Sequence, residues 1–202
     1  MTNKLDASHQ CVLKNWETIT QMRDCATQVE RHLKEFASKI CTAFHAKHHG
    51  NFKSDDMIEK DGYFSLTPFP LLKWKKSELP LLSFGIENTG VENLLHVGSA
   101  DPFSAYVYSA YRANKTVTDS STDKLISIVP PPANFESTFD NPERGYVFQK
   151  VIPRITPADF CDPKKLERHI VTPLAALVAW FTTNEKTILK SFGASRRERK
   201  PR

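Results

Sequence analysis

The sequence has few glycines and no long apolar run, and these two shortages exclude several function classes. Only seven glycines occur in 202 residues, and none lies in the pattern of a Walker loop or a dinucleotide-binding loop. The longest apolar stretch, 170–181, contains Thr172 and Pro173 and is well short of the roughly 20 residues that span a bilayer. A Gly-x-Ser-x-Gly nucleophile elbow is also missing. The sequence therefore predicts neither a phosphate-binding loop nor a membrane span, and no catalytic residues are assigned.

Cysteine is sparse as well, with four residues and no CxxC pair. Cys11, Cys25 and Cys41 fall on one predicted helix, and a rigid helix holds them too far apart to form disulfides with one another. Lys4 and Asp6 lie where the apolar core of a secretory signal would be. We therefore expect free thiols, no secretory signal, and a soluble cytoplasmic protein without membrane association.

The net charge of +5 comes mainly from the C-terminal tail. Residues 196–202 carry five positive charges and one negative charge, which leaves a net charge of +1 for the other 195 residues. Such a tail can contact nucleic acid phosphates or an acidic protein surface with salt-sensitive affinity, and a second basic segment adds a tryptophan that can stack on bases. A solubilising tail and a solvated loop are the alternative. The candidate nucleic-acid or acidic-partner residues are Lys73, Trp74, Lys75, Lys76, Arg196, Arg197, Arg199 and Lys200.

The strongest pattern is an apolar ladder near the N-terminus. Its rungs alternate in steps of three and four residues, which keeps them on one side of a helix. The pattern predicts a helix over 8–49, and Gly50 after two histidines is a conventional helix stop. The rungs are Val12, Asn15, Ile19, Met22, Ala26, Val29, Leu33, Phe36, Ile40 and Ala43, and only Asn15 is polar.

One continuous helix over these residues would be about 60 Å long, whereas a compact chain of this size is about 40–45 Å across. The helix must therefore protrude, pair with another chain, or break. Thr27-x-x-Glu30 has the form of a capping box, so a break near 24–27 is one option.

What covers the ladder is open between two alternatives. Either the chain's own sheet and C-terminal helix cover it, or part of the helix associates with a protein partner or a second copy. Trp16, Ala37 and Phe44 flank the ladder with apolar side chains, which widens the stripe beyond a narrow coiled-coil seam. The candidate interface residues are Ile19, Met22, Val29, Leu33 and Phe36.

The rest of the chain predicts a sheet followed by a helix. Residues 51–61 are polar and are interpreted as a connector, and Pro130 opens a loop that reaches about 145. A helix is expected over 163–192, with a kink or a break at Pro173. Strands are expected over 62–66, 81–87, 91–97, 105–111, 124–129 and 146–152, with a hairpin turn at 88–90 between the second and the third.

The predicted fold is α+β. It has a long N-terminal helix, a largely antiparallel sheet of about five or six strands, and a C-terminal helix, with both helices on one sheet face. The expected organisation is an N-terminal helical segment over 1–50, an α+β body over 51–193 and a mobile basic tail over 194–202.

Two groups of residues are candidates for metal chemistry. Cys41, His45 and His49 share one helical face, but they extend about 12 Å along the axis, so one ion cannot bind all three without a break. A nuclease of the PD-(D/E)XK type needs a strand-borne Glu-x-Lys to hold Mg²⁺. Glu87 ends a predicted strand but lacks the lysine. We therefore expect no metal and no cofactor, and we interpret His96, within an apolar run, as a core or sheet histidine.

The predicted function is that of a non-enzymatic binding protein, an adaptor or a regulatory subunit, which acts through helix surfaces and with possible nucleic-acid contact by the basic tail. The alternative is a divergent metal-dependent nucleic acid enzyme with a site near Glu87. A third hypothesis is a small-molecule binder that uses the sheet and the 130–145 loop.

Overall fold

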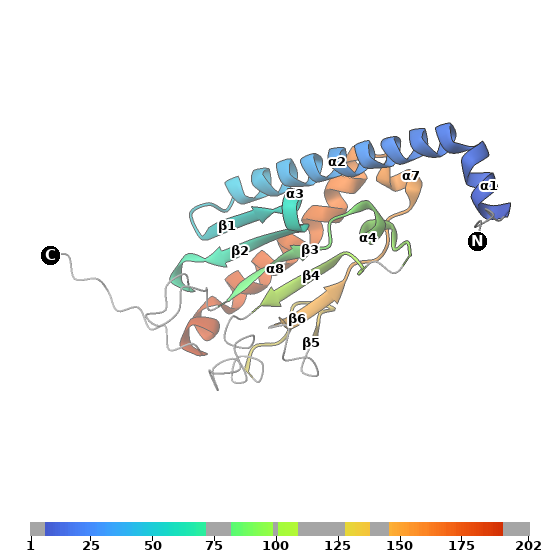
Figure 1. Ribbon diagram of the computed structural model, residues 1–202. Coiled ribbons are helices and arrows are strands. Elements are labelled where there is room, and N and C mark those ends of the chain that lie inside the picture. The colour runs from blue at the N-terminus through green and yellow to red at the C-terminus, as the bar shows by residue number, and fades with distance from the viewer. Residues whose placement is uncertain (1–6, 72–81, 99–100, 109–127, 138–145, 192–202) are drawn as a thin grey trace.

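A computed structural model of the chain describes residues 7–71, 82–98, 101–108, 128–137 and 146–191. It is an α+β structure in which long helices lie along a six-stranded antiparallel sheet of order β1-β2-β3-β4-β6-β5 (Figure 1). The helices are α1 (Ala7–Lys14), α2 (Trp16–Ala46), α3 (Ile58–Asp61), α4 (Val91–Leu95), α7 (Pro157–Phe160) and α8 (Pro163–Ser191), with a 3-10 turn η1 (Phe69–Leu71). The strands are β1 (Phe52–Met57), β2 (Tyr63–Pro68), β3 (Ser83–Glu87), β4 (Ser104–Tyr108), β5 (Glu136–Ser137) and β6 (Tyr146–Val151). The predicted α+β class, with its antiparallel sheet between two long helices in the sequence, is confirmed.

The register of the sheet gathers its large apolar residues on one face. Leu66 pairs with Phe84, Phe84 pairs with Val107, and Val107 pairs with Phe148. Since side chains alternate between the faces along a strand, these cross-strand partners point to the same side. All four are at most 1% exposed, so this face is the floor of the core.

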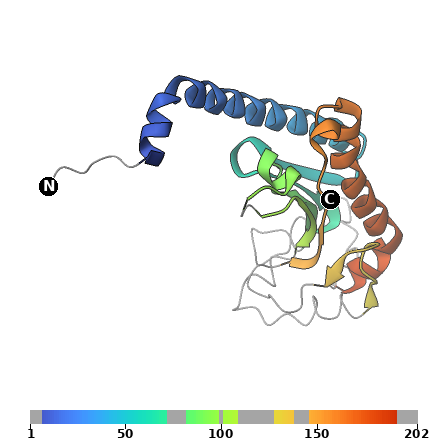
Figure 2. The same ribbon diagram turned by 90° about the vertical axis from the view of Figure 1, so that its right-hand side faces the viewer.

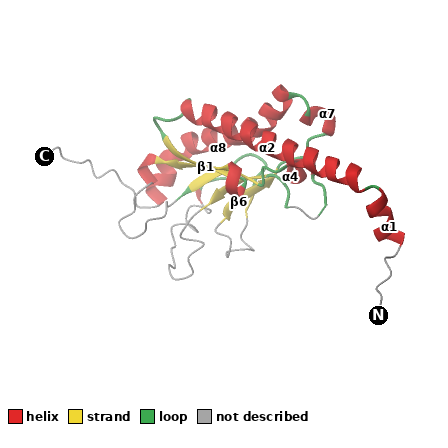
Figure 3. Ribbon diagram, turned by 45° about the horizontal axis from the view of Figure 1, so that its top comes forward, coloured by secondary structure: helices red, strands yellow, loops and turns green. Residues whose placement is uncertain are grey.

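The C-terminal half of α2 and the helix α8 complete this core. Figure 3 shows both helices on the same side of the strands. Phe52 of β1 joins the layers, because its ring lies 5.5 Å from the ring of Phe84 in β3 and 5.6 Å from that of Phe181 in α8. Leu33 and Leu177 bring α2 and α8 into the same cluster of buried residues.

The predicted strand over 91–97 is wrong, because residues 91–95 form the helix α4. The cause lies far away in the sequence: the backbone N–H of Val91 donates to the Glu30 carboxylate of α2 at 2.9 Å. A carboxylate at a helix N-terminus satisfies a free N–H and complements the helix dipole. His96 is exposed and takes the left-handed conformation (φ 53°) that ends α4, so its interpretation as a core or sheet histidine is also wrong.

The polar connector predicted over 51–61 is wrong as well. It contains β1 and α3, and β1 pairs along its length with β2. Only Phe52 is fully buried in this strand. The charged side chains Lys53 and Asp55 are exposed at the edge of the sheet, and Asp56, also exposed, accepts a hydrogen bond from the Ser38 hydroxyl of α2 at 2.8 Å. Charges on an edge strand prevent pairing with other chains, and here they give a strand the composition of a loop.

The N-terminal helix bends at Asn15 and not at 24–27. α2 runs without interruption from Trp16 to Ala46, so the option of a break at 24–27 is wrong. The capping box there is not formed, because the Thr27 hydroxyl donates to the carbonyl of Arg23 at 3.0 Å, within the helix. At Asn15 the side-chain amide donates to the carbonyl of Cys11 at 2.8 Å, which satisfies the last turn of α1 and separates the two helices.

The C-terminal helix is confirmed, and α8 continues through Pro173 without a break. In the predicted loop 130–145, residues 136–137 pair with β6. Most of the strand predicted over 124–129 lies outside the described residues. Within the described part of the chain, none of the helices is both long and apolar enough to cross a membrane.

Candidate functional site

The N-terminal ladder is exposed in one half and covered in the other. Over 12–29 the large side chains of the ladder and of its flanks lie open to solvent: the flanking Trp16 is 57% exposed, and the rungs Met22 and Val29 are 67% and 45% exposed. Figures 1 and 2 show why, since α1 and the first turns of α2 extend beyond the sheet and α8. Six of the ten exposed large hydrophobic residues in the described chain lie in this segment: Val12, Leu13, Trp16, Ile19, Met22 and Val29. We call this set the exposed ladder.

From Leu33 onward α2 packs on the body of the protein. Leu33 is 3% exposed, and the buried residues that follow are Ala37, Cys41 and Phe44. These residues recur every three to four positions with a mean step above 3.5. A ladder with a strict step of 3.5 rotates by about 20° per heptad around a straight helix. The rung Ala43 is consequently exposed, and the flanking residue Phe44 takes its place in the core.

An apolar groove connects the two halves. It has a volume of about 260 Å³ and lies between α2 and the α7–α8 segment. Val29, the last residue of the exposed ladder, lines it, together with Phe36 of the same helix and Phe160 of α7. The apolar surface therefore continues from the projecting part of α2 onto the body.

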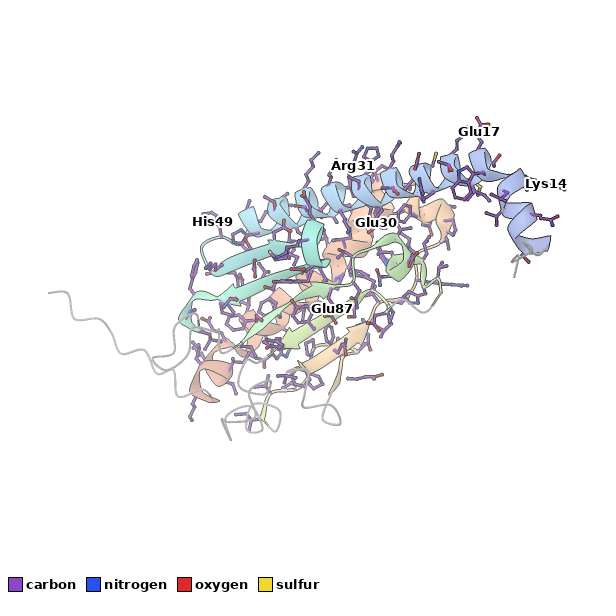
Figure 4. The ribbon with its side chains drawn as sticks, in the orientation of Figure 1. Lys14, Glu17, Glu30, Arg31, His49 and Glu87 are labelled. Carbon is purple, nitrogen blue, oxygen red and sulfur yellow. The ribbon has the colours of Figure 1, made fainter. Side chains whose placement is uncertain are left out.

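Glu30 marks the position where α2 reaches the body. Its carboxylate accepts the N–H of Val91 and also lies 3.5 Å from the Lys34 ammonium. Figure 4 labels Glu30 together with Glu17 and Arg31 along α2. Arg31 forms its ion pair within the helix, 3.8 Å from Glu35. Glu30 and Arg31 thus form their polar contacts within the helix or with the body.

The predicted interface residues fall into two groups. Ile19, Met22 and Val29 belong to the exposed ladder, whereas Leu33 is buried in the chain's own core and Phe36 packs partly against it. Sequence reasoning missed Leu13, which is 57% exposed beside the rung Val12. The only indication in the sequence was that Leu13 is next to the rung Val12. The bend at Asn15, which places α1 apart from α2, is not evident from the spacing of the ladder.

All of the predicted basic contact residues lie outside the described part of the chain. These are Lys73, Trp74, Lys75, Lys76, Arg196, Arg197, Arg199 and Lys200. Their interpretation as a nucleic-acid or acidic-partner site stays a prediction.

Glu87 lies at the end of β3 within a polar network on the sheet (Figure 4). Its carboxylate accepts hydrogen bonds from the Ser104 hydroxyl at 2.9 Å and from the Gln149 amide at 3.1 Å. These contacts join β3, β4 and β6. The nuclease alternative centred on this residue remains a prediction.

The Cys41–His45–His49 constellation is engaged in structural contacts. The His45 ring bridges α2 and β1, since Nε2 lies 2.8 Å from the Phe52 carbonyl and Nδ1 lies 3.1 Å from the Ser54 hydroxyl. Burial, with a smaller contribution from the negative charge of Asp56, raises the pKa of Cys41 well above its usual value. Among the residues that the structure describes, no group of three His, Cys, Asp or Glu side chains is arranged to hold a metal ion.

No protein-family model matches the chain, and comparisons with curated proteins and with solved structures give no match either.

Proposed function

We propose that this protein is a non-enzymatic binding protein that associates through the exposed ladder, and that the occupant of this surface is the same surface of a second copy. One observation carries the proposal: the projecting segment 12–29 holds six of the ten exposed large hydrophobic residues of the described chain. Exposed apolar residues that are scattered singly need no explanation, but a concentrated patch indicates an interaction site.

The spacing of the exposed ladder supports a helix as the occupant. Ile19, Met22 and Val29, with the rung Ala26 between the last two, recur at steps of three and four, and such steps match the groove of another helix that carries the same steps. The charges on α2 up to Arg31 are balanced to within one unit, with three acidic residues against two arginines. Two such helices would approach each other without strong like-charge repulsion.

The pattern is also self-complementary. In a symmetric dimer the same patch of both copies meets across a two-fold axis. An antiparallel pairing centred between Thr20 and Gln21 would set Ile19 of each copy opposite Met22 of the other. It would also bring Trp16 beside Arg23 of the second copy, an arrangement that favours a cation–π contact.

Light scattering coupled to size-exclusion chromatography tests the proposal directly. The expected mass of the wild-type protein is twice the chain mass of 23.0 kDa. Met22→Glu should convert it to a monomer, because the carboxylate would be buried opposite Ile19 in the dimer but solvated in the monomer. Gln28→Glu is the matched control, since it adds the same charge to the same helix at an exposed position off the ladder.

Circular dichroism of each variant verifies that the helices are retained. A wild-type protein that stays monomeric up to about 100 μM, or a Gln28→Glu variant that dissociates as readily as Met22→Glu, would contradict the proposal.

A further inference from the structure

A second feature of the molecule, separate from the exposed ladder, is a cavity beside the first half of α8. It has a volume of about 460 Å³ and lies between the end of β6, the helix α7 and the first half of α8. This volume is within the range of cavities that hold small organic ligands. None of the residues of the exposed ladder lines it.

The lining of the cavity combines an apolar wall with a cationic rim. Ile152, Ile155 and Pro173 contribute to the wall. The rim carries Lys150 from β6 and Lys165 and Arg168 from α8. Such a combination suits a ligand with an apolar body and one charged group, because the body leaves water while the charged group stays near the surface.

Three cations and one carboxylate line the cavity. Asp159 forms an ion pair with Lys165, which leaves Lys150 and Arg168 as the remaining positive charges of the lining. In the described part of the chain neither of the two has an acidic partner, and Lys150 lies 5.9 Å from the centroid of the Phe135 ring. The cavity therefore has a net positive charge that its own residues do not neutralise.

His169 in the wall gives a second, independent indication. Its Nε2 is the one buried side-chain nitrogen or oxygen in the described chain that has no hydrogen-bond partner. An unpartnered buried polar group opposes folding and calls for an explanation, such as a missing ligand or water. The next turn of α8 lacks one donor as well, because Pro173 has no N–H to offer to the carbonyl of His169.

The same histidine does not add to the positive charge. Burial, and then the neighbouring charge of His96, lower the pKa of His169 below its usual value. Its ring is therefore neutral at pH 7, and it lies against the ring of Phe103 at a centroid distance of 5.6 Å.

We propose that this cavity binds a small organic anion, with an aliphatic or aromatic body in the apolar part and a carboxylate or phosphate head held by Arg168 and Lys150. The planar guanidinium of arginine matches both kinds of head with two parallel hydrogen bonds. A cationic ligand is disfavoured by the net charge of the lining, and a neutral one leaves both cations without a partner.

Isothermal titration calorimetry with three ligands of equal chain length tests this proposal on the full chain. The ligands are hexanoate, hexyl phosphate and hexanol. At least one of the two anions should bind about tenfold or more tightly than hexanol, since a charge-assisted hydrogen bond adds that much to an affinity. Which anion binds more tightly identifies the head group.

Four variants separate the charge from the apolar wall. Arg168→Gln and Lys150→Gln should each weaken anion binding about tenfold and leave hexanol binding unchanged. Ala176→Phe should abolish binding of all three ligands, because Ala176 lines the cavity at an exposed position where a ring can fill it. Lys164→Gln is the matched control, since it removes one charge from the exposed surface of α8 outside the cavity.

The proposal is overturned if neither anion binds up to about 5 mM, if the anions bind no more tightly than hexanol, or if Lys164→Gln weakens anion binding as much as Arg168→Gln. Dimerisation is measured separately by light scattering, so a failure of this proposal leaves the proposed function standing, and the reverse also holds.

Discussion

The two halves of α2 carry the same kind of apolar pattern in opposite surroundings. From Leu33 to the end of the helix, the large apolar residues pack against the sheet and α8, and Leu33 and Phe44 are buried. From Trp16 to Val29, apolar residues of similar size lie in solvent. Glu30 lies at the border and holds the N-terminus of α4.

An amphipathic pattern thus specifies that one face of a helix is covered, but not which element covers it. The pattern requires that a face be covered, but the covering element is set by the length of the helix relative to the body. α2 has 31 residues, which corresponds to about 46 Å at 1.5 Å per residue. Among the described residues, the sheet and α8 cover only part of that length, and in the dimer that we propose the second copy covers the exposed half.

The largest difference between the two halves of α2 is expected in the reactivity of their cysteine thiols. Cys25 is exposed on the projecting half of α2, whereas Cys41 is buried in the other half. The raised pKa of Cys41 also keeps its thiol protonated, and the thiolate is the reactive form. We expect Cys41 to react with a thiol reagent at least about a thousandfold more slowly than Cys25, because it must wait for unfolding.

Mass spectrometry of peptides after timed alkylation measures both rates in one sample. Cys161, which is exposed on the body, serves as an internal standard. A rise in protein concentration should slow alkylation of Cys25, which flanks the exposed ladder, relative to Cys161. Equal rates at Cys41 and Cys25 in the native protein would refute the division of α2 into a covered and an open half.

Paired truncations to alanine should separate the halves by stability. Leu33→Ala should lower the free energy of unfolding by about 3 kcal/mol, because it leaves a cavity in the core. Met22→Ala should change it by less than about 0.5 kcal/mol, because this side chain is solvated in the monomer. Urea denaturation, at a protein concentration where light scattering finds monomers, measures both. Comparable losses for the two variants would mean that the body also covers Met22.

Much of the fold is predictable from the sequence because its signals are local. The apolar face of α8 and the short β-like runs that give β3, β4 and β6 each arise from neighbours in the chain. The class and the antiparallel sheet follow from the order of these elements. The errors at 51–61 and 91–97 have non-local causes: β1 is an edge strand with charged residues, and α4 depends on a carboxylate from α2.

The candidate sites are less predictable for the same reason. The rungs Ile19, Met22 and Val29 were found from their spacing, but no pattern in the sequence separates them from Leu33, which the body covers. The anion cavity combines Lys150, which lies in β6, with Arg168 in α8. Residues of that kind are ordinary surface residues until the fold brings them together.

Removal of the Glu30 carboxylate tests the contact that joins α2 to the body at the border between its two halves. Glu30→Ala is expected to destabilise the protein by about 1 kcal/mol, because the N–H of Val91 loses its acceptor and α4 loses a favourable charge at its N-terminus. Thermal unfolding measures the loss, and Glu17→Ala on the projecting half is the control. If the two variants unfold at the same temperature, the contact between Glu30 and Val91 does not hold α2 to the body.

The smallest effect is expected from the largest change, the deletion of residues 1–26. None of the described side chains over 10–26 is buried, so the body should keep its free energy of unfolding to within about 0.5 kcal/mol of the full-length monomer. Thr27 would then stand at the start of the shortened helix, where a threonine hydroxyl caps free N–H groups. Urea denaturation of the truncated chain and of the Met22→Glu monomer gives the comparison. A loss above about 2 kcal/mol would show that the projecting half supports the body, and the exposed ladder would then have a structural role in the monomer. Retained stability together with loss of the dimer would assign the exposed ladder to association alone.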